Sequence, residues 1–292
     1  MDKSALFLSD DKKATIRAWF DTFQAKSPVP TESRSVETSF GQTHALVAGP
    51  QDAPPLVVLH GAIASSAHAL PELGPLLQTR RIYALDVIGQ SVMSEDRRLD
   101  LSDDSYGQWL VEATTALGLK SFDLYGVSWG GFVGHKAARF APERVTRLVL
   151  LVPAGFVAGN VWAGMRDAAW PMLRFRLFPS SKNLARAVKG QFTTVDADWT
   201  AYFGDALRCY RFDMRIPPLA NDGDFSSVKC PVLVFGAEND VSFPGSPLLK
   251  RACELMPHAE VELLKGSKHC PPFTDEFRSQ MAARIERFLR DN

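Results

Sequence analysis

The stretch "SFDLYGVSWGG" (121–131) decides the fold. Strand-forming residues lead directly into "GVSWG" (126–130), and a segment of helical period, 129–140, follows. The pattern G-x-S-x-G at such a joint predicts a sharp turn between a strand and a helix. The turn is expected to force Ser128 into a left-handed backbone conformation that costs about 1 to 3 kcal/mol. The serine hydroxyl would then stand clear of the carboxyl edge of a sheet.

Short β-branched runs alternate with helical segments along most of the chain. The expected strands are 55–61, 81–87, 121–128, 145–152, 231–237 and 259–266. The expected helices are 66–79, 103–118, 129–140, 246–256 and 275–290. Near-continuous apolar strands separated by helices are typical of an α/β protein with a parallel sheet covered on both faces. The alternating stretch 33–49, which turns at "GQ", is expected to add two antiparallel strands at one edge.

One region interrupts this alternation. Residues 155–226 show no convincing strand, and this segment is expected to form a helical cap over the sheet's edge. The expected organisation is therefore 1–154 for the first part of the core, 155–226 for the cap and 227–292 for the second part of the core. An amphipathic helix at 11–24 should dock on the core. The cap aromatics are expected mainly to pack the cap itself: Trp162, Trp170, Phe175, Phe178, Trp199, Tyr202, Phe203 and Tyr210.

The composition limits the classes of partner. Lys plus Arg and Asp plus Glu both number 33 in 292 residues, so the net charge of zero favours neither nucleic acid nor anionic lipid as a partner. The four cysteines lie far apart without a C-x-x-C pair, which indicates neither a zinc site nor a disulfide framework. No stretch resembles a signal peptide or a membrane span, so a cytoplasmic location without a membrane partner is expected.

A serine hydroxyl is a weak nucleophile unless a base accepts its proton. In a sheet of this type the base should lie on a loop at the carboxyl ends of the strands, after the serine in the chain. His258 precedes the strand at 259–266 and lies at the wrong end, whereas His269 follows it. We therefore predict Ser128 as nucleophile and His269 as base. The other four histidines are expected to be structural or surface residues: His44, His60, His68 and His135.

The base needs a carboxylate that holds its tautomer. The segment after the strand at 145–152 has no acid, but "GAENDVSFP" after the strand at 231–237 offers Glu238 and Asp240. Asp240 lies further past the strand end and is preferred, with Glu238 as the alternative.

An oxyanion hole would require two backbone N–H groups near the serine hydroxyl. One donor is expected to be Trp129, the residue after the nucleophile. The other should come from the loop after the strand at 55–61, most simply from Ala62, with Ile63 as the alternative.

With these motifs in place, the chain resembles the α/β-hydrolase superfamily over nearly its whole length, in strand order, elbow, cap position and triad order. The stretch "SFGQTHALVAGPQDAPPLVVLHGAIASS" (39–66) is similar to bacterial carboxylesterases of the naproxen esterase type, which share its "FGQTH" hairpin and its "APPLV-LHGA" strand and loop. The resemblance implies a mostly parallel eight-stranded sheet and the triad Ser128, Asp240 and His269. Here the acid lies one residue further past Gly236 than in many relatives. Asp86 in "DVIGQS" matches a turn of the family and is taken as structural.

The resemblance implies hydrolysis of a small to medium carboxylic ester through an acyl-serine, with no metal and no organic cofactor. The same residues would also serve acyl transfer, lactone opening or cleavage of carbon–carbon bonds. A ligand receptor of the same fold is a non-enzymatic alternative. The aromatic cap suggests an apolar acyl or alcohol group. The expected partner is a small-molecule ester, and the expected state is a monomer or homodimer.

Overall fold

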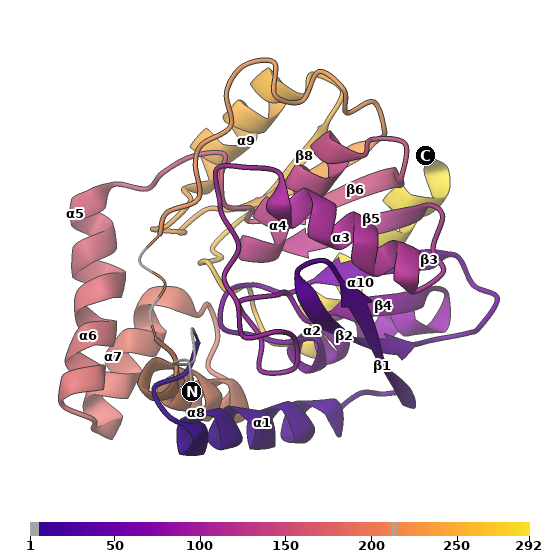
Figure 1. The fold of residues 1–292 in the computed structure, drawn as a ribbon. Helices are drawn as coiled ribbons and strands as arrows, with labels where there is room; N and C mark the ends of the chain where they lie inside the picture. The colour runs from indigo at the N-terminus through magenta and orange to yellow at the C-terminus, as the bar shows by residue number, and fades with distance from the viewer. Residues whose placement is uncertain (1–5, 212, 214) are drawn as a thin grey trace.

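The computed structural model describes residues 6–211, 213 and 215–292. Its centre is an eight-stranded sheet with strand order β1-β2-β4-β3-β5-β6-β7-β8 (Figure 1). The strands are β1 (Thr31–Thr38), β2 (Gly41–Ala48), β3 (Pro55–Leu59), β4 (Arg81–Leu85), β5 (Phe122–Val127), β6 (Val145–Leu151), β7 (Val232–Ala237) and β8 (Glu260–Leu264). β2 pairs antiparallel with β1 and β4, and every other pair is parallel. The prediction of a mostly parallel eight-stranded sheet is confirmed.

The predicted hairpin forms β1 and β2, but its turn was placed two residues too late. Thr38 pairs with Gly41, so the reversal falls at Ser39 and Phe40 rather than at "GQ". Gly41 has φ +114°, and a Cβ there would lie 2.6 Å from the Glu95 side chain. The glycine therefore closes the turn as the first residue of β2.

Helices cover both faces of the sheet. They are α1 (Asp10–Gln24), α2 (Ser66–Glu72), the 3-10 helix η1 (Gly74–Gln78), α3 (Ser105–Ala116), α4 (Trp129–Phe140), α9 (Gly245–Leu255) and α10 (Asp275–Asp291). The single helix predicted for 66–79 is wrong, because the chain splits there into α2 and η1. Pro75 explains the break, since it has no N–H to donate to the Pro71 carbonyl and its ring would clash with that carbonyl in a continuous α-helix.

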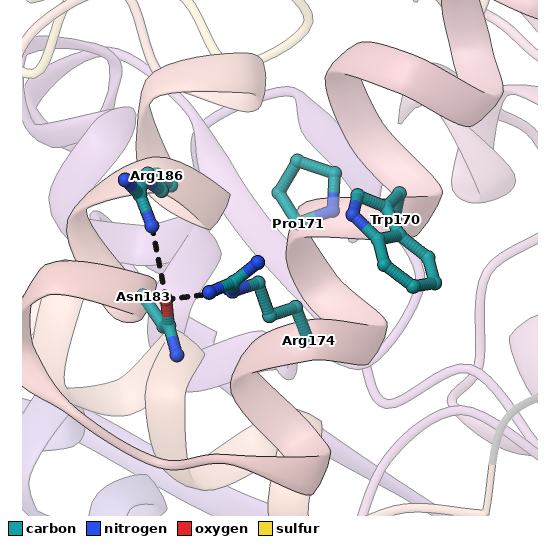
Figure 2. A pocket seen from close by; sticks show the side chains of 5 residues that line it. All are labelled: Trp170, Pro171, Arg174, Asn183 and Arg186. Atoms are coloured by element: carbon teal, nitrogen blue, oxygen red, sulfur yellow. Dashed lines mark hydrogen bonds between the residues drawn. The ribbon is translucent and has the colours of Figure 1, made fainter.

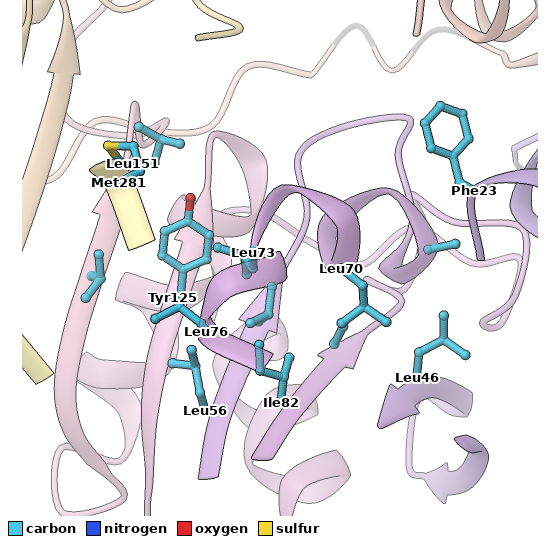
Figure 3. Packing of buried hydrophobic residues seen from close by; sticks show 14 of the residues in the cluster. Phe23, Leu46, Leu56, Leu70, Leu73, Leu76, Ile82, Tyr125, Leu151 and Met281 are labelled. Carbon is cyan, nitrogen blue, oxygen red and sulfur yellow. The ribbon is translucent and has the colours of Figure 1, made fainter. Parts of the chain in front are cut away.

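Two apolar clusters lie on opposite faces of the sheet. One joins inward-facing strand residues such as Leu56 and Ile82 to side chains of α1, α2 and α10 (Figure 3). The other joins Val57 and Leu59, the alternate residues of β3, to side chains of α3, α4 and α9. Phe23 of α1 belongs to the first cluster, so the N-terminal helix docks on the core as expected.

Four α-helices and one π-helical turn stand between β6 and β7, and we call them the inserted helices. They are α5 (Val161–Gly164), η2 (Met165–Ala169), α6 (Trp170–Leu177), α7 (Ser181–Gln191) and α8 (Ala197–Cys209), and they lie together to one side of the sheet (Figure 1). Phe175, Tyr202 and Tyr210 are buried, as expected of packing residues. Three further aromatics that were expected to pack are instead exposed: Trp162, Trp170 and Phe178.

The exposure agrees with the packing of these helices, because α5, which carries Trp162, contacts mainly the next turn η2, and α6 packs against α7 and α8 without covering Trp170. None of the helices in the described ranges is both long and apolar enough to cross a membrane.

Candidate active site

Ser128 alone forms the turn between β5 and α4. Its backbone has φ +51° and ψ −111°, the left-handed region that a residue other than glycine rarely adopts. Three hydrogen bonds hold this backbone in place. The Ser128 N–H donates to the Leu151 carbonyl at 2.9 Å, and its carbonyl accepts the N–H groups of Phe132 and Ala154, each at 3.1 Å. The strain predicted for this position is therefore present and locked by the neighbouring strand end.

The two glycines of the motif allow an unusually close approach of backbone segments. A Cβ added at Gly126 would lie 2.5 Å from the Gly130 carbonyl oxygen, and a Cβ at Gly130 would lie 2.3 Å from the Leu59 carbonyl oxygen. Any larger residue would push the start of α4 away from the end of β3. The spacing of the motif thus fixes where the Ser128 hydroxyl points.

His269 lies between Ser128 and Asp240. Its Nε2 is 3.0 Å from the Ser128 Oγ, and its Nδ1 is 2.7 Å from the Asp240 Oδ2. The other carboxylate oxygen of Asp240 accepts the N–H groups of Ser242 at 2.7 Å and Phe243 at 3.1 Å. Asp240 is buried, whereas Ser128 and His269 are partly exposed. The structure thus brings the three predicted side chains together at one edge of the sheet, with the serine open to solvent.

The alternative acid and base lie apart from this group. Glu238 is exposed, and its Oε2 accepts the Gly266 N–H at 2.8 Å. His258 is exposed as well, with its Nε2 3.1 Å from the Cys230 carbonyl oxygen. The geometry therefore favours Asp240 over Glu238 and His269 over His258.

The pKa of His269 reflects two opposing effects. Burial disfavours the charged imidazolium, but the negative charge of Asp240 and its hydrogen bond outweigh this effect and raise the pKa above the ordinary value. His269 is consequently a better proton acceptor than an isolated imidazole, and its protonated form is stabilised in place.

The loop after β3 passes beside Ser128. A Cβ added at Gly61 would lie only 3.6 Å from the Ser128 Cβ. Within the described part of the chain, neither the Ala62 amide nor the Trp129 amide donates to a protein acceptor. Trp129 is the first residue of α4, where N–H groups have no partner inside the helix. Neither predicted oxyanion donor is therefore engaged by an acceptor in the described part of the protein.

Ile63 differs from Ala62, because both of its backbone polar groups are occupied. Its N–H donates to the Gln90 Oε1 at 3.3 Å, and its carbonyl accepts the hydroxyl of Tyr202 from α8. Ile63 has φ +49°, a strained value for a β-branched side chain. These contacts hold the loop and favour Ala62 over Ile63 as the donor. Tyr202 was expected only to pack the cap, and no local pattern predicts its contact with Ile63, because the two residues lie 139 positions apart.

His60 helps to hold the loop after β3 in place. It is buried, its Nε2 accepts the Val87 N–H at 2.9 Å, and its Nδ1 lies 2.7 Å from the Gly61 carbonyl oxygen. This pattern requires the neutral tautomer with the proton on Nδ1. Burial lowers the pKa of His60 and keeps it in that form. His60 therefore shapes the loop, as the sequence predicted.

Asp86, which is buried directly after β4, makes several side-chain contacts that hold the surrounding structure. Its carboxylate accepts the Ser66 N–H at 2.9 Å and the hydroxyls of Ser66 and Ser91 at 2.6 and 2.5 Å, and it lies 2.6 Å from the His44 Nδ1. Burial opposes its charge, but these contacts prevail and lower its pKa. Among the described residues, no group of three or more His, Cys, Asp or Glu side chains could hold a metal ion.

Comparison with known proteins places this geometry in context. A family model described as alpha/beta hydrolase fold matches residues 54–195. Two Bacillus subtilis proteins are similar to the chain: "Uncharacterized carboxylesterase nap", 27% identical over 83% of this chain and 82% of its own, and "Carboxylesterase YbfK", 28% identical over 83% of each. The crystal structure of naproxen esterase from Bacillus subtilis superposes with a TM-score of 0.82 at 26% identity, over 97% of this chain and 99% of that one. The chain therefore has the α/β-hydrolase fold and is a homologue of these bacterial carboxylesterases.

Proposed function

We propose that the protein is a serine carboxylesterase that cleaves small to medium carboxylic esters through an acyl-serine at Ser128. One observation carries the proposal. The Ser128 Oγ, on a strained elbow beside two free amides, lies 3.0 Å from the His269 Nε2, whose Nδ1 lies 2.7 Å from a buried carboxylate. The similarity to carboxylesterases supports the same reaction class.

Acylation begins at the Ser128 hydroxyl. The His269 Nε2 accepts the hydroxyl proton while Oγ attacks the ester carbonyl carbon, and Asp240 stabilises the imidazolium that forms. The negative charge moves to the carbonyl oxygen, where the amides of Ala62 and Trp129 would donate hydrogen bonds. The tetrahedral intermediate then collapses, and His269 gives its proton to the leaving alcohol.

Deacylation repeats these steps with water as the nucleophile. His269 accepts a proton from the water while the water oxygen attacks the acyl carbon, and Ser128 leaves with that proton. The carboxylic acid product is released and the serine hydroxyl is restored. Each proton passes through one imidazole, so the cycle needs no group beyond these residues and water.

The inserted helices would form the cap of this site, spanning about 155–226 between core parts 1–154 and 227–292. Tyr202 of α8 already contacts the loop that carries Ala62. Aromatic residues are frequent in this segment, which supports an apolar acyl or alcohol group in the substrate.

A panel of p-nitrophenyl esters tests the proposal. The acetate, butyrate and hexanoate esters, together with a charged ester such as the hemisuccinate, would be compared at equal protein concentration. We expect the butyrate and hexanoate to be cleaved faster than the charged ester. Equal rates across the panel would contradict an apolar site. Absence of turnover by folded protein on every ester would contradict the esterase proposal itself.

A further inference from the structure

The helical run from α5 through η2 to α6 leaves an apolar face uncovered. Trp162 is 83% exposed and Trp170 is 56% exposed, values that are high for tryptophan. Their apolar neighbours on the run are exposed as well: Val161, Met165, Leu173, Leu177 and Phe178. A contiguous run of exposed apolar side chains marks an interaction surface.

Positive charge is concentrated in the same helices. Residues 161–191 contain six arginines and lysines but a single acid, Asp167, which pairs with Arg166. Four of these cations are exposed and form no ion pair within the described ranges of the chain: Arg174, Lys182, Arg186 and Lys189. The net charge of zero predicted no anionic-lipid partner. That sum over the whole chain does not show that positive charge is concentrated in one segment.

A cavity joins the apolar and the cationic groups. Trp170 and Pro171 line one side of a cavity of about 260 Å³ between α6 and α7, and Arg174, Asn183 and Arg186 line the rest (Figure 2). The Arg174 Nε and the Arg186 Nη1 both donate to the Asn183 Oδ1, at 3.2 and 3.3 Å. Two guanidinium groups thus converge on one neutral oxygen. Their remaining N–H groups are suited to a phosphate.

We propose that the face formed by α5, η2 and α6 docks on the surface of an anionic phospholipid membrane. Trp162 and Trp170 would enter the headgroup layer, while Arg174 and Arg186 would bind a lipid phosphate. The docking step does not depend on the catalytic chemistry. The consequence of docking would be that the enzyme hydrolyses esters held in a lipid layer, and this consequence rests on the proposed esterase function.

Three physical features favour this occupant. Tryptophan side chains are enriched at the membrane–water interface, and exposed cations are attracted by the negative surface of anionic lipids. Trp170, Arg174 and Leu177 follow one another at helical spacing, so apolar and cationic side chains share one face of α6. A second copy of the chain would instead bring two cationic faces together, which like-charge repulsion disfavours.

Vesicle binding by the Ser128→Ala chain tests docking without turnover. Co-sedimentation would use phosphatidylcholine vesicles with and without about 30 mol% phosphatidylglycerol, at low and high salt. We expect binding to the anionic vesicles that weakens with salt and is far weaker on the neutral ones. The pair Arg174→Ala and Arg186→Ala should reduce the affinity by about tenfold or more. The pair Trp162→Ser and Trp170→Ser should also reduce it.

A matched pair controls for loss of charge alone. Lys229 and Arg287 are exposed on the core and form no ion pair in the described part of the chain, so Lys229→Ala with Arg287→Ala should leave vesicle affinity within about twofold. Equal binding to neutral vesicles, or equal losses for both pairs of cations, would overturn the proposal. So would saturation of the arginine site by inorganic phosphate without any vesicle binding.

Two further readouts separate the remaining cases. Sedimentation velocity would assign the face to a second copy if a dimer dissociates in the tryptophan variants and no vesicle binding is found. Hydrolysis of soluble p-nitrophenyl butyrate by the Arg174→Ala and Arg186→Ala chain, with Ser128 intact, should stay unchanged. Failure of the docking proposal would thus be visible separately from failure of the esterase proposal.

Discussion

The described part of the molecule holds two serine–histidine–aspartate groups with nearly the same hydrogen bonds. The candidate active site is one. In the other, His44 of β2 has its Nε2 2.6 Å from the Ser33 Oγ of β1 and its Nδ1 2.6 Å from the Asp86 Oδ2. Side-chain distances alone therefore do not distinguish a nucleophile from a structural serine.

The backbone around the two serines differs. Ser33 lies within β1, paired with Leu46 of β2, so its neighbours have ordinary strand geometry and no helix begins beside it. Ser128 has φ +51°, α4 begins at the next residue, and the loop at Gly61 passes close by. Within the described ranges, the amides of Ala62 and Trp129 beside this elbow have no protein acceptor. The elbow and its adjacent amides, rather than the side-chain triad, are therefore the features that separate Ser128 from Ser33.

The two carboxylates also differ in what they hold. Asp86 accepts hydrogen bonds from Ser66 and Ser91 in addition to contacting His44, so it ties loops together inside the core. Asp240 contacts His269, and its second oxygen is held by backbone amides. His269 keeps 18% of its side chain exposed, against 3% for His44. The imidazole beside Asp240 is therefore the more accessible of the two.

Replacing each serine gives the largest expected contrast. Ser128→Ala should lower turnover of p-nitrophenyl butyrate by about four powers of ten or more, because among the described residues Ser128 is the hydroxyl that contacts His269. Ser33→Ala should change turnover by less than about threefold and cost about 1 kcal/mol of stability through its lost hydrogen bond. Similar losses of turnover in both variants would break the comparison.

Replacing the acid comes next in size. Asp240→Asn should lower kcat by about three to four powers of ten, because the amide no longer holds the productive tautomer of His269. Steady-state kinetics on the same ester measure the effect. Glu238→Gln is the matched control and should stay within about threefold of wild type, since Glu238 contacts Gly266 instead. A larger loss in the Glu238 variant would reassign the acid.

The smallest expected effect concerns the loop beside Ser128. Tyr202→Phe removes the hydroxyl that holds the Ile63 carbonyl, and we expect kcat to fall about tenfold with little change in KM, because an indirect support counts for less than an oxyanion donor. Tyr106→Phe, which removes a buried hydroxyl in α3, should leave both parameters unchanged. A rise in KM alone would assign Tyr202 to substrate binding instead of positioning.

Much of the sheet and of the site could be predicted because each part depends on local pattern. The motif at 126–130 and the rule that parallel strands end at one edge were enough to predict that Ser128 and His269 lie close together. The break between α2 and η1 escaped prediction although Pro75 could have signalled it, because the apolar period continues across it.

Other features depend on packing between distant segments and have no local signature. The contact of Tyr202 with Ile63 exists only once the inserted helices pack on the core, and the contact of Gln90 with Ile63 joins two core loops that are 27 positions apart. Likewise, the sequence shows that the segment is rich in aromatics, but the exposure of Trp162 and Trp170 depends on how α5 and α6 pack against the neighbouring helices.

Covalent labelling would show whether Ser128 is the nucleophile. A fluorophosphonate reacts with an activated serine because it resembles the tetrahedral intermediate and leaves a stable phosphonyl group on the hydroxyl. Peptide mapping by mass spectrometry of the labelled, folded protein would locate that group. We predict about one adduct per chain, on Ser128, with none on Ser33. An adduct on Ser33, or an unlabelled Ser128 in protein that still hydrolyses esters, would contradict the account.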